Sequence, residues 1–252
     1  MKLFHEHKVT LLGSIALLIS SCSSSPTPLP AVPTLPIVTL PPAATVTPTT
    51  TAQAEDISQL PPDLAYEILL EQVKQSDPNF DFTELRWTFA QTANYDPYNF
   101  DDSGLEDSMY DAYNNQEYEL AIELANQMLE KNYLLPDLHF IVLQSYQELG
   151  DQENADFHNY FLRGLVTSIA KSGDGRSPET AFIVIQIEEE YFMLNILGLQ
   201  DSEQTFTEIN GIPYDIFNGV DENTNNPATI YFDISIPYSW LDNPMPPQQQ
   251  TP

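Results

Sequence analysis

Apolar residues recur every three or four positions along most of the segment from residue 63 to residue 172. This spacing places one apolar stripe along an amphipathic helix. Prolines and acidic residues mark where the individual helices begin. The expected helices start at Pro61-Pro62-Asp63, at Asp81, at Gln116-Glu117-Tyr118 and at Pro136-Asp137. The pattern therefore predicts a mainly helical segment over residues 63–172.

From residue 173 onward the helical period gives way to short β-branched runs. Strands are expected over residues 181–187, 204–209, 212–217 and 229–236, with one helix near 188–198. Asn210-Gly211 separates two of these runs, and this dipeptide is a strong signal for a two-residue hairpin turn. The sequence thus predicts an α+β fold, in which an N-terminal antiparallel helical layer packs with a small, mainly antiparallel β-sheet at the C-terminus.

Small and aromatic residues in the helical segment favour closely packed helix pairs. Their spacing is tetratricopeptide-like at Tyr118, Ala121, Ala125, Leu129, Tyr146, Gly150 and Ala155. The match covers about one and a half repeats, whereas a free-standing solenoid needs about three. The helical layer is therefore expected to pack against another element, and the C-terminal sheet is the available partner.

Residues 1–21 have the layout of a secretory signal peptide. Two lysines precede an apolar run, Val9–Ile19, which is shorter than the roughly 20 residues of a membrane-spanning helix. The next residues, Ile19-Ser20-Ser21-Cys22, resemble a bacterial lipobox. This resemblance implies cleavage between Ser21 and Cys22 and lipid attachment at Cys22, with acyl chains such as palmitate holding the protein on the membrane. The alternative is an ordinary signal peptide with an incidental cysteine, although Cys22 is the only cysteine of the chain.

The remaining sequence divides into three parts. Residues 22–62 are rich in proline and threonine, a composition that favours a disordered, semi-rigid polyproline spacer. Residues 63–243 are expected to form one globular domain, helical over 63–172 and β-rich over 173–243. Residues 244–252 are expected to be a disordered tail. The domain would then stand away from the membrane at the end of a stiff tether.

The formal net charge of −29 restricts the possible partners. After the signal, the basic residues are Lys74, Arg86, Lys131, Arg163, Lys171 and Arg176, too few for a basic patch. Nucleic acid is therefore not expected as a partner. The acidity can serve solubility alone, or it can attract Ca²⁺ or a cationic partner.

Few residues after the signal suggest chemistry. His139 and His158 lie on neighbouring predicted helices, where they could approach each other or an acid, or serve only as packing residues. Asp174 and Arg176 flank Gly175 in a turn that could bind a ligand or could simply end a helix, with Gly173 as its cap. The candidate binding residues are therefore His158, Arg163, Asp174 and Arg176. No cofactor, metal site or catalytic residue is expected.

Two acidic motifs are interpreted as structural. Asp221-x-Asn223-x-Asn225 matches the opening of a calcium-binding EF-hand loop, but Asn226 stands where the loop needs glycine and Phe232 where it needs glutamate. The run Glu188-Glu189-Glu190 is expected to be a solvated helix start, since acidic side chains favour the N-terminal end of a helix. Their use as a glycosidase pair would need a partner from another part of the fold.

Several motifs together resemble a known family. They are Phe82-Thr83-Glu84-Leu85-Arg86, Tyr95-Asp96-Pro97-Tyr98, Glu148-Leu149-Gly150-Asp151, Ser172-Gly173-Asp174-Gly175, Ser177-Pro178-Glu179-Thr180-Ala181-Phe182, Glu189-Glu190-Tyr191, Tyr231-Phe232-Asp233-Ile234 and Trp240-Leu241. With them the chain resembles the bacterial exported proteins of domain of unknown function 4919, from about Pro78 to Leu241. The resemblance implies an exported module and supplies no reaction, substrate or catalytic residue.

Three functions are compatible with these patterns. The first is a non-enzymatic lipoprotein, anchored to the bacterial membrane by its lipid and displayed outside the cytoplasm, that binds an unknown protein or glycan of the cell envelope. The second is an envelope enzyme of the hydrolase type, with His158 and nearby carboxylates in a cleft between the helices and the sheet. The third is a purely structural spacer. We expect the first, because catalytic motifs are missing and the anchor and spacer suit display.

Overall fold

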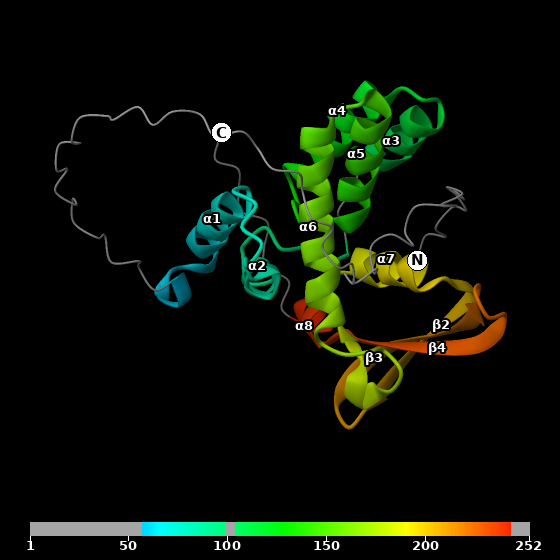
Figure 1. The fold of residues 1–252 in the computed structure, drawn as a ribbon. Helices are drawn as coiled ribbons and strands as arrows, with labels where there is room; N and C mark the ends of the chain where they lie inside the picture. Colours follow the sequence, from blue (N-terminus) through cyan, green and yellow to red (C-terminus); the bar gives the residue numbers. More distant parts are fainter. Residues whose placement is uncertain (1–56, 99–103, 243–252) are drawn as a thin grey trace, which may run out of the picture.

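The computed structural model describes residues 57–98 and 104–242 (Figure 1). Ser21, Cys22 and the predicted spacer up to residue 56 lie outside the described residues, as does the chain from residue 243 onward. The helical part comprises η2 (Ile57–Gln59), α1 (Pro62–Val73), α2 (Phe82–Phe89), α3 (Leu105–Asn114), α4 (Tyr118–Leu129), α5 (Pro136–Leu149) and α6 (Gln152–Ala170). The C-terminal part comprises η3 (Pro178–Thr180), β1 (Phe182–Ile183), α7 (Ile187–Leu197), β2 (Leu199–Ile209), β3 (Ile212–Asp221), β4 (Asn226–Asp233) and α8 (Ser235–Asp242).

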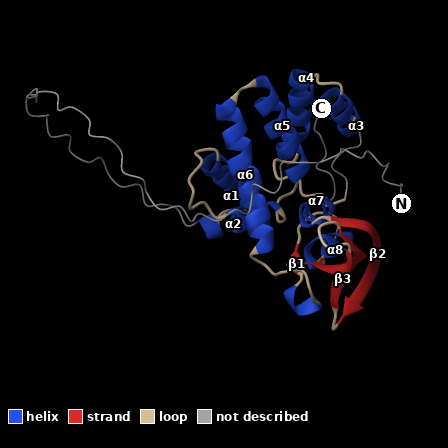
Figure 2. Ribbon diagram, turned by 45° about the vertical axis from the view of Figure 1, so that its right-hand side comes forward, coloured by secondary structure: helices blue, strands red, loops and turns tan. Residues whose placement is uncertain are grey.

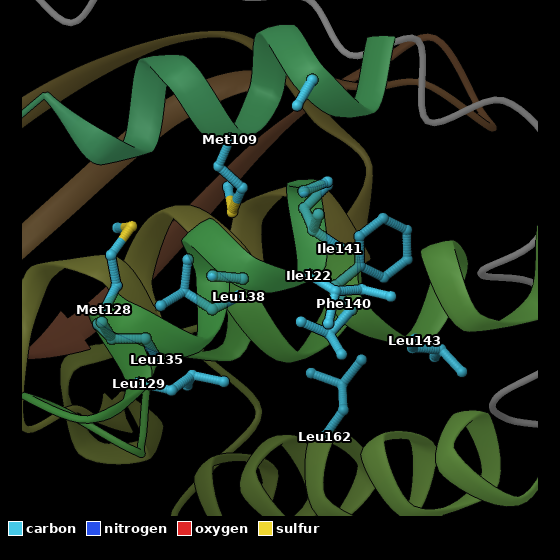
Figure 3. Packing of buried hydrophobic residues seen from close by; sticks show 14 of the residues in the cluster. Met109, Ile122, Met128, Leu129, Leu135, Leu138, Phe140, Ile141, Leu143 and Leu162 are labelled. Carbon is cyan, nitrogen blue, oxygen red and sulfur yellow. The ribbon is translucent and has the colours of Figure 1, made fainter. Parts of the chain in front are cut away.

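Helices α3 to α6 form a layer in which each helix packs against the next in the chain. Their apolar stripes meet in one core, into which Met109 of α3 and Leu162 of α6 project from opposite sides of Leu138 (Figure 3). Helices α1 and α2 pair beside this layer, and α2 packs on α6, where Phe82 meets Phe161 edge to face. The mainly helical segment is thus confirmed. Whether its pairs are tetratricopeptide-like stays a prediction.

Local sequence signals define several helix ends. Pro136 occupies the first turn of α5, where the N–H that proline lacks would have no partner in the helix. Gly150 ends α5 with a φ of 74°, a left-handed conformation that glycine adopts without a steric penalty. The Asp81 carboxylate accepts a hydrogen bond from the Thr83 N–H and thereby caps α2. The two helix starts are the ones that the sequence predicts, whereas the end of α5 at Gly150 was not predicted.

The sheet has four strands in the order β1-β4-β3-β2. Strands β2, β3 and β4 are antiparallel, and only the short β1 runs parallel to β4. Asn210 and Gly211 join β2 to β3 with φ values of 54° and 82°, so both adopt the left-handed conformation that a two-residue hairpin turn of type I′ requires. The sheet is therefore mixed and mainly antiparallel, and the predicted α+β class is confirmed.

Helix α7 lies between the helical layer and the sheet (Figure 1). Its Phe192 joins the core of the helical layer, whereas Met193 and Leu194 join Phe217 and Phe232 in the core beneath the sheet. A helix that contributes to two cores has little solvated surface. This position determines how the acidic residues at its start are used.

Three local expectations are wrong. The strand expected over residues 181–187 shortens to β1. The N–H of Ile185 donates to Glu189 of α7 instead of to a strand, and Gln186 is the N-cap residue of α7. The strand expected over 229–236 ends at Asp233, whose carboxylate accepts a hydrogen bond from the Ser235 N–H and begins α8. Gly173 does not cap α6 in a left-handed conformation; the positive φ in this turn belongs to Gly175.

Candidate functional site

Arg86 and Glu189 form a buried ion pair between α2 and α7. Arg86 Nε donates to Glu189 Oε1 at 2.7 Å, and its second terminal nitrogen donates to Oε2 at 2.6 Å. Both side chains are only 1% exposed. The remaining guanidinium nitrogen donates to Ser168 Oγ on α6 at 2.8 Å. This two-pronged contact gives both partners strong, directional hydrogen bonds in a site without bulk water.

The same pair fixes the strand side of the fold. Arg86 also donates to the carbonyl of Ile183 at 3.1 Å, and Glu189 Oε2 accepts the N–H of Ile185 at 2.9 Å. Nearby, the Tyr95 hydroxyl donates to the Ile185 carbonyl. One carboxylate and one guanidinium therefore join α2, α6, β1 and α7, and their role is structural.

Glu190, the next residue of α7, lies near Asp215 of β3. Glu190 is fully buried, and neither of its carboxyl oxygens has a hydrogen-bond partner in the described part of the chain. Two ionised carboxylates cannot hydrogen-bond each other, since both are acceptors. Burial first, and then the charge of Asp215, raise the pKa of Glu190 well above its usual value. Glu190 therefore keeps its proton to a higher pH than an ordinary glutamic acid does.

The contact between these acids is closed on the remaining sides by polar and aromatic groups. Gln204 of β2 donates from Nε2 to Asp215 Oδ2 at 2.7 Å, and its Oε1 accepts from the Tyr191 hydroxyl at 3.3 Å. Tyr98 lies close enough that burial and the nearby Glu190 and Asp215 raise its pKa to about 12. We call the two acid contacts of α7, Arg86–Glu189 and Glu190–Asp215, the α7 seam.

The α7 seam corrects an expectation from the sequence. Glu189 and Glu190 are not a solvated helix start, because α7 is covered by the helical layer on one side and by the sheet on the other. Residues from the motifs that carry the family resemblance meet here: Arg86, Tyr95, Tyr98, Glu189, Glu190 and Trp240. These motifs were the one sequence signal for the seam, and they did not show which of their residues contact one another.

An exposed aromatic patch lies beside the seam, on β2 and α8. Phe206 is directly opposite Asp215 in the β2–β3 register, and its ring stacks on Tyr238 of α8 at 5.4 Å. Phe206 is 51% exposed, Tyr238 36% and Leu241, one turn further along α8, 53%. Trp240 instead faces inward, toward Tyr98. We call Phe206, Tyr238 and Leu241 the aromatic patch. Sequence reasoning missed it, because residues 229–236 were expected to continue as a strand.

A second group of acids lies where α5 and α7 begin. Burial, with Glu106 nearby, raises the pKa of Asp137 to about 7. Burial, and then the neighbouring acids Asp137 and Glu189, raise the pKa of Glu188 to about 8. Within residues 57–98 and 104–242 no cluster of three or more histidine, cysteine, aspartate or glutamate side chains has the arrangement of a metal site.

His139 and His158 do approach each other, as the sequence suggested they could. Their Nδ1 atoms are 3.0 Å apart, and His139 Nε2 lies 2.9 Å from the carbonyl of Tyr133. A carbonyl only accepts, so His139 carries its proton on Nε2 and its Nδ1 accepts from the Nδ1–H of His158. Burial lowers the pKa of His139 to about 3 and that of His158 to about 4. Both rings are thus neutral members of the aromatic core around Phe161.

The other candidate binding residues lie apart from His158. Arg163 is exposed on α6. Asp174 organises the turn after α6, where its Oδ1 accepts from the N–H of Arg176 at 3.1 Å and from the Thr180 hydroxyl at 2.6 Å. Arg176 reaches Asp174 at 4.0 Å. Asp174 and Arg176 therefore form one local turn, and no shared site with His158 is seen.

The loop that resembles an EF-hand opening is a turn between β3 and β4. Asp221 Oδ1 accepts hydrogen bonds from the N–H groups of Asn223 and Thr224 at 2.8 and 3.1 Å. The carboxylate oxygen that a calcium ion would need is thus engaged by the backbone. The lipid-attachment prediction at Cys22, with cleavage after Ser21, falls outside the described residues.

A small cavity lies between α1, α2 and the segment joining α4 to α5. Its volume is about 150 Å³, below the roughly 300–1,000 Å³ of ordinary small-molecule sites. Tyr66, Phe89 and Tyr133 line it with several acids, among them Asp63, whose carboxylate already accepts the N–H of Ala93. The cavity can hold a single small group and is too small for a substrate.

The fold and the α7 seam define one α+β module with a buried acidic interface and an exposed aromatic patch. The chain belongs to the family described as Domain of unknown function (DUF4919), whose model matches residues 54–241. Neither a curated protein nor a solved structure matches the chain. None of the helices over residues 57–98 and 104–242 combines the length and apolar character needed to cross a membrane.

Proposed function

We infer that this protein is a non-enzymatic binding module, held by a lipid on Cys22 and displayed outside the cytoplasmic membrane. The observation that carries this proposal is the aromatic patch. Its three residues are between 36% and 53% exposed, and they come together from β2 and α8. Contiguous exposed apolar side chains mark interaction surfaces more often than chance placement.

The side chains capable of acid–base chemistry also favour a binding module over an enzyme, because they are buried inside the protein. Glu189 is held by Arg86, Glu190 is buried near Asp215, and the two histidines contact each other. Reactive side chains engaged in this way stabilise the domain. The side chains left to meet a partner are the aromatic patch and the acidic surface around it, which favour a neutral or cationic partner.

The anchor can be tested separately from the binding. Cells producing the full chain would be grown with radioactive palmitate and compared with cells producing the Cys22→Ala variant. We expect label in the natural chain and none in the variant. Equal labelling of both would overturn the lipid anchor and leave the binding proposal to stand on the patch alone.

The binding proposal is tested by photo-crosslinking on intact cells. A photoreactive phenylalanine analogue would replace Tyr238 in the aromatic patch or, as the matched control, Trp87 of α2, which is 47% exposed. We expect a crosslinked product of one defined mass from position 238 and none from position 87. The absence of any product at 238, or the same products at both positions, would contradict binding through the patch.

An envelope hydrolase is the alternative proposal, and one observation favours it. The pKa values of Glu190 and Asp215 are both raised, first by burial, and neighbouring acids with shifted pKa values also form the catalytic pair of aspartic proteases. The version with His158 has less support, since the hydrogen bond of His158 runs to His139. If hydrolysis of an envelope peptide were found and were lost in both Glu190→Gln and Asp215→Asn, the alternative would replace the binding proposal.

A further inference from the structure

Strand β2 is an edge strand of the sheet. The strand order ends with β2, which pairs only with β3 among the described residues. Figure 2 shows β2 at the outer side of the sheet, away from β1. It is 11 residues long, and the register with β3 is irregular only between Gln200 and Glu203. A regular edge from Glu203 to Ile209 is therefore available for pairing.

The backbone groups on this free edge follow from the contacts of Pro213. Glu208 lies opposite Pro213 in the register, and Pro213 has no N–H, while its carbonyl accepts the N–H of Ile234 on its other side. The pair Glu208–Pro213 is thus not hydrogen-bonded across the two strands. Antiparallel pairing alternates with every residue. The N–H and C=O groups of Gln204, Phe206 and Glu208 therefore point away from β3.

An exposed edge of this kind invites another strand, and proteins usually protect it. Lysine and proline, two common protective residues, are absent from β2. Its charged side chains are Asp201, Glu203 and Glu208, all exposed. Opposed like charges destabilise cross-strand pairs. A second copy of the chain, with its net charge of −29, is therefore repelled, whereas a cationic strand is attracted.

We propose that the free edge of β2 binds an extended polypeptide segment in which two basic side chains flank apolar ones. This inference rests on the proposed binding function and names its partner. The outward N–H and C=O groups of Gln204, Phe206 and Glu208 supply the backbone hydrogen bonds. Basic side chains of the bound strand lie beside Glu203 and Glu208, and an apolar side chain packs on Phe206.

The aromatic patch gives this edge an anchor. Phe206 and Glu208 lie on the same face of β2, since side chains alternate along a strand, and Phe206 is stacked on Tyr238. An apolar side chain of the added strand would extend this stack by one cross-strand pair. The patch and the edge therefore form one continuous surface, which can contact the backbone, the charged side chains and the apolar side chains of a bound strand.

The experiment uses the mature full-length chain carrying Cys22→Ala and a fluorescent peptide of about eight residues, the length of an ordinary strand. The peptide consists of valines and two lysines, which are placed to lie beside Glu203 and Glu208. Binding is followed by fluorescence anisotropy. The double variant Glu203→Lys, Glu208→Lys should bind this peptide about tenfold more weakly, or about 1.4 kcal/mol, and should gain binding to the same peptide with glutamate in place of both lysines. Retained preference for the lysine peptide would overturn the inference.

A second pair of variants tests the backbone contact. Phe206→Pro removes one outward N–H and keeps all the hydrogen bonds between β2 and β3. Proline is tolerated on edge strands. Phe206→Ala keeps the N–H and loses the ring. We expect the proline variant to bind at least about tenfold more weakly than the alanine variant. Equal binding by the two variants would exclude strand addition.

The outcomes separate this inference from the binding proposal. If the lysine peptide fails to bind while crosslinking at position 238 persists, the strand inference falls and the binding module stands. If crosslinking at 238 also fails, both fall.

Discussion

The α7 seam and the free edge of β2 use polar groups in opposite ways. In the seam, charged and polar side chains lie against one another inside the protein: Arg86 holds Glu189, and Glu190 lies near Asp215, whose charge adds to the effect of burial in raising the pKa of Glu190. Along β2, backbone groups and acidic side chains face outward with no partner strand among the described residues. Gln204 belongs to both regions, because its side chain contacts Asp215 and its backbone lies on the edge.

This difference predicts which substitutions affect stability and which affect binding. Satisfied polar contacts in a buried seam are costly to break, so substitutions there should change the free energy of unfolding. Exposed groups on an edge contribute little to folding, so substitutions there should change binding and leave stability nearly intact. Substitutions in the α7 seam that left stability unchanged, or substitutions on the β2 edge that unfolded the protein, would contradict this difference.

The largest effect is expected from Arg86→Met. The substitution leaves Glu189 buried without its charged partner, a situation that costs about 3–5 kcal/mol of unfolding free energy. Urea unfolding followed by circular dichroism measures it. The control is Lys74→Met, which removes the exposed pair with Glu71 and should cost under about 0.5 kcal/mol. Equal losses for the two variants would show that the buried pair does not organise the seam.

A smaller effect with the opposite sign is expected from Glu190→Gln at alkaline pH. Because the folded pKa of Glu190 is raised, the folded state holds a proton that the unfolded state has released above about pH 4.5. Its stabilising contribution is complete below that pH and is lost as pH rises toward the folded pKa. Glutamine stays neutral and removes this dependence. The variant should match the natural chain at pH 4.5 and be more stable than the natural chain at pH 8.

The matched control for that comparison is Glu222→Gln, an exposed acid on the turn after β3. The urea midpoint of Glu190→Gln should equal that of the natural chain at pH 4.5 and exceed it at pH 8, whereas the midpoint of Glu222→Gln should equal that of the natural chain at both pH values. A constant offset for Glu190→Gln at both pH values would mean that Glu190 holds no extra proton in the folded state.

The acid side of the pH profile depends on the histidine pair. The folded pKa of His158 is lowered to about 4, so below about pH 6.5 the unfolded chain binds protons that the folded chain does not. Stability is therefore lost as pH falls from about 6.5 toward 4, by about 1.4 kcal/mol per pH unit. His158→Phe should lose about 2 kcal/mol less than the natural chain between pH 6.5 and pH 5. An unchanged slope would place the titration elsewhere.

The smallest change in stability is expected at the aromatic patch. The double variant Phe206→Ala, Tyr238→Ala removes an exposed stacked pair, which should cost roughly 0.5–1 kcal/mol, while peptide binding is lost. Calorimetric melting of the variant measures the cost. A loss as large as that of Arg86→Met would mean that the patch is a part of the core and not a contact surface.

Much of the fold could be predicted because its signals are local. Asn210-Gly211 determines its own turn, and Pro136 marks the start of α5 within one residue. The start of α8 had a local signal too, since Asp233 is a helix-capping residue, but the β-branched Ile234 and Ile236 favoured a strand. Packing of Ile236 with Trp240 outweighs the strand propensity of these isoleucines. A single sequence does not show such tertiary contacts.

The seam could not be predicted because its partners are distant in the chain. Arg86 and Glu189 are 103 residues apart, and three consecutive glutamates at a helix start usually face water. Only the placement of α7 between two cores makes them buried. The histidine pair was suggested by helix spacing and confirmed by contact, whereas Arg163, Asp174 and Arg176 were not brought together with it. The lipid anchor at Cys22 stays a prediction.

The claim that the β2 edge is free and ready to pair is tested most directly by amide hydrogen exchange, residue by residue. In the free protein we expect fast exchange at Gln204, Phe206 and Glu208 and slow exchange at Thr205 and Thr207, whose N–H groups face β3. Adding the lysine–valine peptide should slow the three fast amides. Slow exchange at all five positions in the free protein would show that the edge is already covered, and would contradict the account.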